Sequence, residues 1–271
     1  MYLSINIGFT DDSPLAIYDA EFGDDDSPTS EMVYEYSAPK CFSQDIFEFA
    51  SPEVTNGNLG KYAENVSDTD TNIDAIAESQ TDNFRPPWRW ILIGPERSGT
   101  GLHVDPLYTN AWVTVLQGRK RWLLFPPSTP PEKTGMIPNQ PQIPSSTWFR
   151  DYYDMTTGPE WPEEWKPVEV LQEIGETVFV PSGWPHLVLN LELTVAVTHN
   201  YASEFGPFER MWKQVVEDEP EFADRWLRGM QLCREKNYLV ERIVKYHKDA
   251  VGRGEDWANE FALFGGDKNH T

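Results

Sequence analysis

The chain has 271 residues, of which 39% are hydrophobic and 13% aromatic, so it is rich enough in apolar side chains to fold and is not a disordered segment. Its net charge of −22 repels nucleic acid phosphates and attracts basic peptides, which favours a basic protein partner over nucleic acid. The alternative is that the charge serves solubility alone. The two cysteines cannot form a disulfide framework, no apolar run reaches the roughly 18 residues of a membrane span, and the first residues lack a secretory pattern. These features predict an intracellular protein with no membrane partner.

Residues 1–50 are predicted to form sparse elements that pack on a larger core. Residues 14–18 favour a short strand, and a helix is expected after a cap at Ser43, with Phe42, Ile46, Phe47 and Phe49 on its apolar face. Residues 51–83 are rich in Asn, Thr, Ser, Asp and Glu and hold few large apolar side chains. We interpret them as a mobile insertion, apart from a short helix that the pattern allows at 74–78.

Residues 84–205 carry a dense β pattern and are predicted to form the core domain. Strands are expected at 88–93, 111–116, 121–125, 168–171, 176–180, 186–191 and 194–200. Residues 117–120 are typical of a hairpin turn, and the Pro- and Trp-rich residues 126–167 of a long loop that acts as a lid or substrate wall. Many short strands at even spacing predict a mainly β fold, a double-stranded β-helix of the jelly-roll or cupin type with flanking helices.

Residues 206–271 change to a helical period. Phe208, Met211, Trp212, Val215 and Val216 lie on one face of a predicted helix, Pro220 can begin a second one, and 238–250 favour a third. These helices either only pack on the barrel or form a homodimer interface, and the sequence leaves both readings open.

Two histidines and one aspartate carry the strongest chemical signal. A composition of 5 His and 44 acidic residues gives about 0.8 His-x-acid matches by chance, and the chain has two. His103 and Asp105 lie among strand-like segments, where residues i and i+2 point to the same side, whereas His247 and Asp249 lie in a helical pattern that points them apart. With His186, the first pair predicts the facial triad of a non-haem Fe(II) oxygenase.

An iron site with three open positions suits an anionic co-substrate such as 2-oxoglutarate, whose distal carboxylate needs a cation and hydroxyl groups. Lys120 is the candidate cation, and Thr100 and Thr198 are the candidate hydroxyls. Spacing alone favours an exposed turn lysine at 120. Trp122 and Phe125 favour instead a half-buried strand, in which a lysine requires a partner.

Four stretches of the chain closely resemble the JmjC-domain oxygenases. They are residues 85–90, the stretch 94–106 that ends in Gly-Leu-His-Val-Asp-Pro, residues 118–127 and residues 175–186. The Arg-Ser-Gly-Thr-Gly stretch at 97–101 is similar to one subgroup in particular, the bifunctional arginine demethylases and lysyl-hydroxylases. The resemblance covers roughly residues 11–50 and 84–205.

The resemblance implies an enzyme, a 2-oxoglutarate-dependent dioxygenase. It implies Fe(II) on His103, Asp105 and His186. It implies the distal carboxylate of 2-oxoglutarate on Lys120 and Thr100, with Thr198 contributing. The implied reaction splits the keto acid with O2 into succinate and CO2 and hydroxylates a lysine side chain at C5 in a basic protein. Arginine demethylation is a second implied activity, and the implied location is the nucleus, with the cytoplasm as the alternative.

Two departures from the subgroup favour an alternative. Val113 stands where the subgroup carries an asparagine, and Ala16 stands where it carries a tyrosine, so two polar groups near the co-substrate are missing. The alternative is a catalytically weak or inactive barrel that serves as a binding or scaffold protein. An oxygenase acting on RNA or a small molecule is a third reading, and the acidic charge argues against RNA.

Overall fold

The computed structural model describes residues 11–24, 27–42, 44–55, 85–137 and 140–261. The chain divides into two compact units, one of residues 1–21 and 89–200 and the other of residues 22–88 and 201–271. The four-part division predicted from the sequence, with boundaries after residues 50, 83 and 205, stays a prediction. Most of its polar segment, including the short helix at 74–78, lies outside the described residues.

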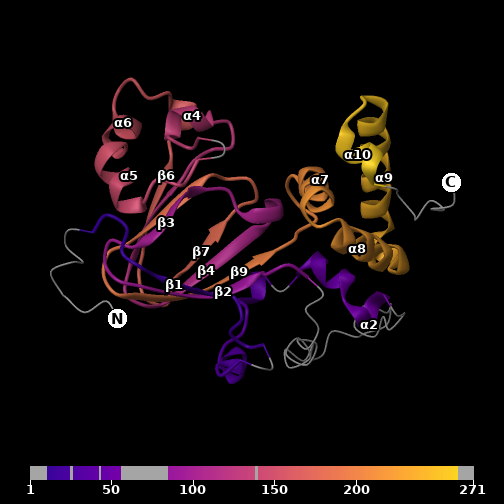
Figure 1. The fold of residues 1–271 in the computed structure, drawn as a ribbon, viewed down its shortest axis with the longest axis horizontal. Helices are drawn as coiled ribbons and strands as arrows, with labels where there is room; N and C mark the ends of the chain where they lie inside the picture. The colour runs from indigo at the N-terminus through magenta and orange to yellow at the C-terminus, as the bar shows by residue number, and fades with distance from the viewer. Residues whose placement is uncertain (1–10, 25–26, 43, 56–84, 138–139, 262–271) are drawn as a thin grey trace. The chain divides into compact units, whose positions relative to one another are not determined.

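The first unit is built from two sheets of antiparallel strands (Figure 1). The five-stranded sheet has the order β1-β2-β9-β4-β7, and the four-stranded sheet has the order β3-β8-β5-β6. The strands are β1 (Ile17–Asp19), β2 (Arg89–Gly94), β3 (Gly99–His103), β4 (Asn110–Gln117), β5 (Lys120–Leu124), β6 (Val168–Gln172), β7 (Thr177–Val180), β8 (His186–Asn190) and β9 (Thr194–Tyr201). This arrangement confirms the predicted mainly β, cupin-type barrel, and all seven strands predicted for the core are present.

The prediction of a hairpin between β4 and β5 is wrong. β4 lies between β9 and β7, whereas β5 lies between β8 and β6, so the turn at 118–119 carries the chain from one sheet to the other. Gly118 makes this crossing possible, because its φ of 79° lies in the left-handed region and a side chain there would collide with the carbonyl of Leu193. The turn residues predict a reversal of direction, but they do not determine which sheet the next strand joins.

Apolar side chains fill the space between the two sheets. Trp122 of β5 lies opposite Val188 of β8, and both side chains point inward. The other buried members of this inner cluster are Ala111, Val113, Val115, Leu124, Val178, Val180 and Ala196. Because strand residues alternate between faces, these positions identify which polar residues of the same strands also point into the barrel.

The outer face of the four-stranded sheet is covered by residues 126–167, which were predicted to be a long loop. That prediction is wrong in part, because the segment contains α4 (Pro131–Thr134), α5 (Ser145–Asp151), α6 (Tyr153–Thr157) and the 3-10 turn η6 (Glu163–Trp165). In Figure 1 these helices gather beside β3 and β6. Trp148 and Trp161 of this segment pack with Leu123, Phe125 and Leu187 of the sheet, so the segment is a fixed wall of the barrel.

The second unit is helical. Its main helices are α7 (Phe208–Asp218), α8 (Pro220–Leu232), α9 (Asn237–Gly252) and α10 (Asp256–Glu260), with short elements η1 (Ser30–Tyr34), η2 (Lys40–Phe42), η3 (Ile46–Ala50) and α2 (Pro52–Thr55). The predicted cap residue Ser43 lies outside the described residues, and Asp45 is the residue that caps η3 by accepting a 3.0 Å hydrogen bond from the Phe47 amide. Phe47 packs edge-on against Trp226 of α8. None of the described helices is both long and apolar enough to cross a membrane.

Candidate active site

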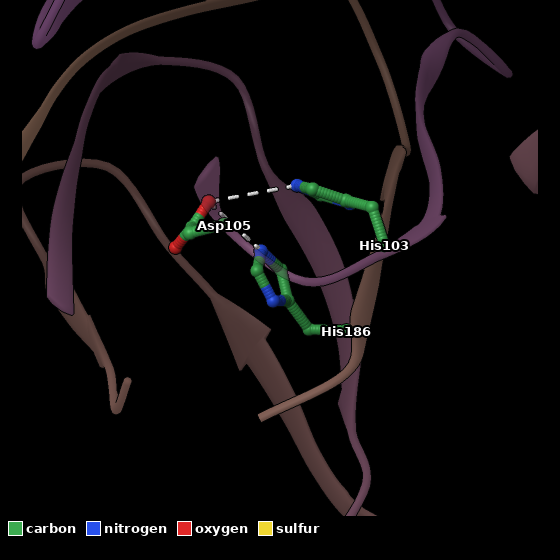
Figure 2. A group of neighbouring side chains, drawn as sticks. All are labelled: His103, Asp105 and His186. Carbon is green, nitrogen blue, oxygen red and sulfur yellow. Dashed lines mark ion pairs between the residues drawn. The ribbon is translucent and has the colours of Figure 1, made fainter. Parts of the chain in front are cut away.

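His103 and His186 face each other across the ladder between β3 and β8. They are direct register partners, and their ring centroids lie 4.2 Å apart. Asp105 follows His103 by two residues, and its Oδ1 lies 3.7 Å from His103 Nε2 and 3.9 Å from His186 Nε2 (Figure 2). One ligand atom of each residue lies within 4.8 Å of the others. The structure therefore brings together the three side chains that the sequence predicts as metal ligands, close enough to surround one ion.

A β-bulge in β3 turns the histidine into the site. Thr100 pairs with Val188 and His103 pairs with His186, so two residues separate the first pair of positions and only one separates the second. The extra residue lets Thr100 and His103 point to the same inner side, although residues i and i+3 of a regular strand point to opposite sides. Gly101 lies in the bulge, where a side chain would collide with the Ile143 carbonyl, 2.5 Å from the Cβ position.

Backbone carbonyls fix the orientation and tautomer of both imidazoles. His103 Nδ1 lies 2.8 Å from the Gly101 carbonyl oxygen, and His186 Nδ1 lies 3.0 Å from the Trp184 carbonyl oxygen. A carbonyl can only accept a hydrogen bond, so each Nδ1 carries a proton and each Nε2 presents its lone pair. Metal-ligating histidines usually donate a hydrogen bond of this kind from the ring nitrogen that does not bind the metal.

The charges of the three residues suit a divalent cation. Burial, together with the nearby His103, lowers the pKa of His186 to about 4, which keeps that imidazole neutral at physiological pH. Burial acts to raise the pKa of Asp105, but its interactions with His103 and His186 outweigh that effect and lower it. Asp105 Oδ2 is buried and accepts no hydrogen bond from the described residues. Two neutral imidazoles and a carboxylate with an unused oxygen fit an iron ion.

The second His-x-Asp pair is not part of a group of three potential ligands among the described residues, and its exclusion as a metal site stays a prediction. His247 lies in α9, and its Nε2 lies 2.8 Å from the Ala258 carbonyl oxygen. Among the described residues, the only group of three or more potential ligands is His103, Asp105 and His186.

Lys120 is buried inside the barrel and is not an exposed turn residue. It is the first residue of β5, it is 4% exposed, and its Nζ donates a 2.9 Å hydrogen bond to Oδ1 of Asn190, its partner across the β5–β8 ladder. No carboxylate of the described residues forms an ion pair with it. Burial lowers its pKa to about 8. A buried ammonium group with one neutral partner is costly, and an anionic ligand would compensate it.

A chain of hydrogen bonds holds the partner of Lys120 in place. Asn190 Nδ2 donates to Ser98 Oγ over 2.9 Å, and Ser98 Oγ donates to the Pro95 carbonyl over 2.6 Å. The amide is thereby oriented so that its oxygen faces Lys120. Neither Asn190 nor Ser98 was predicted as a site residue, although the alternation of His186, Val188 and Asn190 along β8 places all three on the inner face.

The two predicted hydroxyl residues also point into the barrel. Thr100 is opposite Val188, and Thr198 of β9 alternates with Ala196, so each shares a face with a member of the inner cluster. Thr100 Oγ1 lies 3.2 Å from the hydroxyl of Tyr18 on β1, a residue that the sequence analysis did not identify. The roles of Lys120, Thr100 and Thr198 toward a co-substrate stay predictions.

The two departures from the family pattern, Val113 and Ala16, are apolar residues of the unit that contains the barrel. Val113 is buried in the inner cluster. Ala16 lies beside Gly94, where a side chain would contact both the Ala16 methyl, at 3.1 Å, and Asn190 Nδ2, at 2.8 Å. An apolar group therefore lies near the amide that binds Lys120.

Comparison with known proteins supports the same family. Residues 90–201 match the family model described as a JmjC domain, hydroxylase. The bifunctional arginine demethylase and lysyl-hydroxylase psr-1 of Caenorhabditis elegans is 37% identical over 240 residues, which are 86% of this chain and 50% of that protein. The arginine-specific demethylase JMJ22 of Arabidopsis thaliana is 35% identical over 206 residues, which are 74% of this chain and 34% of that protein.

A solved structure, the ribosomal oxygenase YcfD of Escherichia coli, matches 49% of this chain and 28% of its own at 14% identity with a TM-score of 0.27, and at that score it adds nothing to the sequence matches. The chain spans about half the length of the psr-1 proteins that it matches. The family model covers the strands that carry His103, Lys120 and His186, and the segment after β3 that carries Asp105. The chain therefore carries a JmjC domain of the hydroxylase family over residues 90–201.

Proposed function

We propose that this chain is an Fe(II)- and 2-oxoglutarate-dependent protein oxygenase that hydroxylates lysine side chains at C5, with arginine demethylation as a second activity. The observation that carries the proposal is the convergence of His103, Asp105 and His186. Each histidine Nδ1 is hydrogen-bonded to a backbone carbonyl, so each Nε2 keeps its lone pair for a metal ion. The names of the curated relatives, psr-1 and JMJ22 among them, point to lysine and arginine side chains of proteins as the substrate class.

Each half of the site has a task in this reaction. His103, Asp105 and His186 would hold the iron on one face and leave the opposite face open. When bound, iron would bring O2 and the keto-acid end of 2-oxoglutarate together near the substrate C–H bond and relay the four electrons that O2 takes up, two from the keto acid and two from the C–H bond. Lys120 would bind the distal carboxylate by a charge-assisted hydrogen bond, with the Asn190 amide holding its ammonium group in place. The net reaction converts O2, 2-oxoglutarate and the C–H bond into succinate, CO2 and the hydroxylated substrate.

The charge of the chain supports a basic peptide as the substrate. With 44 acidic residues against 22 lysines and arginines, its field attracts cationic segments and raises their rate of encounter. The same field disfavours RNA.

Mass spectrometry tests this proposal directly. Metal-loaded protein is incubated with 2-oxoglutarate, ascorbate and lysine- and arginine-rich peptides, and both peptide mass and succinate are measured. We expect a gain of one oxygen atom on lysine and stoichiometric succinate. Loss of a methyl group with release of formaldehyde from a methylarginine peptide would assign the demethylase activity instead. A sample that binds the metal but forms no succinate with any peptide would refute the proposal and favour the scaffold reading, which the apolar Val113 and Ala16 support.

A further inference from the structure

We propose that Tyr18 is a positioning residue of the co-substrate pocket, which orients the hydroxyl of Thr100 so that it donates to the distal carboxylate of 2-oxoglutarate. This inference rests on the proposed function. It adds to the pocket a residue of the short edge strand β1, far from the metal ligands in sequence. The observation behind it is the pair of contacts that the Tyr18 hydroxyl makes with two consecutive residues of β3.

The register of β1 turns Tyr18 toward the inner side of the barrel. Tyr18 lies opposite Leu92 of β2, and Leu92 packs against the inner cluster. Opposite residues of an antiparallel pair point to the same side, so the Tyr18 ring follows Leu92 inward. The tyrosine remains 49% exposed, because β1 is the edge strand of its sheet. Ala16, two residues away on the same face, offers only a methyl group, so Tyr18 is the hydroxyl that this strand directs to the pocket.

The hydrogen atoms of the two hydroxyls permit only a few arrangements. The Tyr18 hydroxyl lies 3.0 Å from the Gly99 carbonyl oxygen and 3.2 Å from Thr100 Oγ1. A carbonyl has no hydrogen to give, so Tyr18 either donates to Gly99 or donates to Thr100. If Tyr18 donates to Gly99, then the two hydroxyls stay hydrogen-bonded only when Thr100 donates to Tyr18, and Thr100 then has no hydrogen left for a ligand.

Binding of a carboxylate selects the other arrangement. Thr100 then donates to the anion, and Tyr18 turns its hydrogen toward Thr100 Oγ1. Two hydroxyls in series polarise each other, so the bond from Thr100 to the carboxylate is strengthened. Without the tyrosine hydroxyl, Thr100 loses the donor that fixes its rotamer, and part of the binding free energy is spent on ordering it.

A double-mutant cycle tests this inference on the complete chain. The dissociation constant of 2-oxoglutarate is measured by calorimetry, without oxygen and with Fe(II) bound, for the wild type, Tyr18→Phe, Thr100→Val and the double variant. Loss of one hydrogen bond predicts that Tyr18→Phe binds 2-oxoglutarate roughly 3- to 10-fold more weakly. Thr100→Val is expected to have at least the same effect, and the double variant to equal Thr100→Val, because Tyr18 acts through Thr100.

Two controls separate this role from a structural one. Tyr34→Phe removes a hydroxyl from a tyrosine that is 68% exposed in the other compact unit, and it should leave binding unchanged. The affinity for Co(II), followed by its visible absorption, should be the same in Tyr18→Phe as in the wild type. An unchanged dissociation constant in Tyr18→Phe would overturn the inference, and so would a loss from Tyr18→Phe that is equally large in the wild type and in the Thr100→Val variant. Failure of the metal-loaded wild type to bind 2-oxoglutarate would refute the proposed function itself.

Discussion

The metal centre and the co-substrate pocket of this barrel are held in place in different ways. In the metal centre, defined as His103, Asp105 and His186, each imidazole is fixed by a carbonyl two residues away in its own strand or turn. In the co-substrate pocket, defined as Lys120, Thr100 and Thr198, Lys120 depends on Asn190, 70 residues away, and Thr100 contacts Tyr18, 82 residues away. Local backbone geometry determines the first region, whereas cross-strand side-chain contacts determine the second.

The two regions also carry opposite charge. The metal centre presents one carboxylate and two neutral imidazoles, which suits a cation, and the pocket presents a buried ammonium group without a carboxylate partner among the described residues, which suits an anion. Substitution of a metal ligand should therefore weaken metal binding strongly, whereas substitutions in the pocket should weaken 2-oxoglutarate binding and leave metal affinity unchanged.

The largest effect is expected from Asp105→Ala. This substitution removes the only carboxylate of the metal centre and leaves two neutral imidazoles, so the affinity for Fe(II) or Co(II) should fall by at least about 100-fold. Titration with Co(II), followed by its visible absorption, measures the loss. Asp249→Ala is the matched control, because Asp249 belongs to the other His-x-Asp pair, and it should bind metal like the wild type. If Asp105→Ala kept its metal affinity and formed succinate, the assignment of the metal centre would be wrong.

A smaller but still large effect is expected from Lys120→Met. Loss of a charge-assisted hydrogen bond should weaken 2-oxoglutarate binding roughly 10- to 100-fold, while metal affinity stays unchanged. Calorimetry measures both, and Lys133→Met, at an exposed lysine of α4, is the control. Equal binding of 2-oxoglutarate by Lys120→Met and the wild type would remove Lys120 from the pocket.

The pH dependence of stability and of 2-oxoglutarate binding gives a second test of Lys120. The pKa of Lys120 in the folded protein is lowered to about 8 from 10.5, so between these pH values the unfolded chain binds the proton and the folded chain does not. The free energy of unfolding of the protein without ligand should therefore gain a contribution that rises with pH across this window, of about 3 kcal/mol. Lys120→Met should lack that rise in urea titrations. Co-substrate binding should run the other way and weaken above pH 8, because it requires the protonated lysine.

The same contrast explains what could be predicted from the sequence. Residues i and i+2 of a strand point to the same side, whereas those of a helix point apart. This difference was enough to choose His103 and Asp105 over His247 and Asp249 as metal ligands. Lys120 was predicted in a half-buried strand with a partner, as the structure has it, but its strand was wrongly paired in a hairpin, because a turn signal does not say which sheet the next strand joins. Tyr18, Asn190 and Ser98 were missed because their contacts depend on the register between strands, which could not be read from the local sequence pattern, although the alternation along β8 did place Asn190 on the inner face.

The helices between residues 131 and 157 were missed for a different reason. They are four to seven residues long, too short for a helical period to emerge from a Pro-rich sequence. Their buried side chains, Trp148 above all, are stabilised by the sheet beneath them. Tertiary packing therefore decides the structure of this segment.

The smallest effect on metal affinity is expected from a substitution of Ser182, which is not a metal ligand but holds the segment after Asp105. Leu107 and Tyr108, just after Asp105, have φ values of 56° and 55°, a left-handed conformation that costs non-glycine residues roughly 1–2 kcal/mol each. Ser182 holds this segment, because its hydroxyl donates to the Tyr108 carbonyl and its amide donates to Asn110 Oδ1 over 3.0 Å. Since Ser182 lies four residues before His186, these bonds connect the segment after Asp105 to the turn before His186.

Ser182→Ala tests whether that connection positions the metal ligands. It removes the hydroxyl bond, keeps the amide bond and leaves all three ligands in the chain, so the Co(II) affinity should fall by roughly 3- to 10-fold. At saturating metal the 2-oxoglutarate affinity should be unchanged, because the pocket is held by other side chains. Ser146→Ala is the matched control, since the Ser146 hydroxyl also donates to a distant carbonyl, that of Asp12. It should lower the melting temperature without changing metal affinity. Equal metal affinities in the two serine variants would mean that backbone carbonyls alone position His103 and His186, and would make the contrast between the two regions complete.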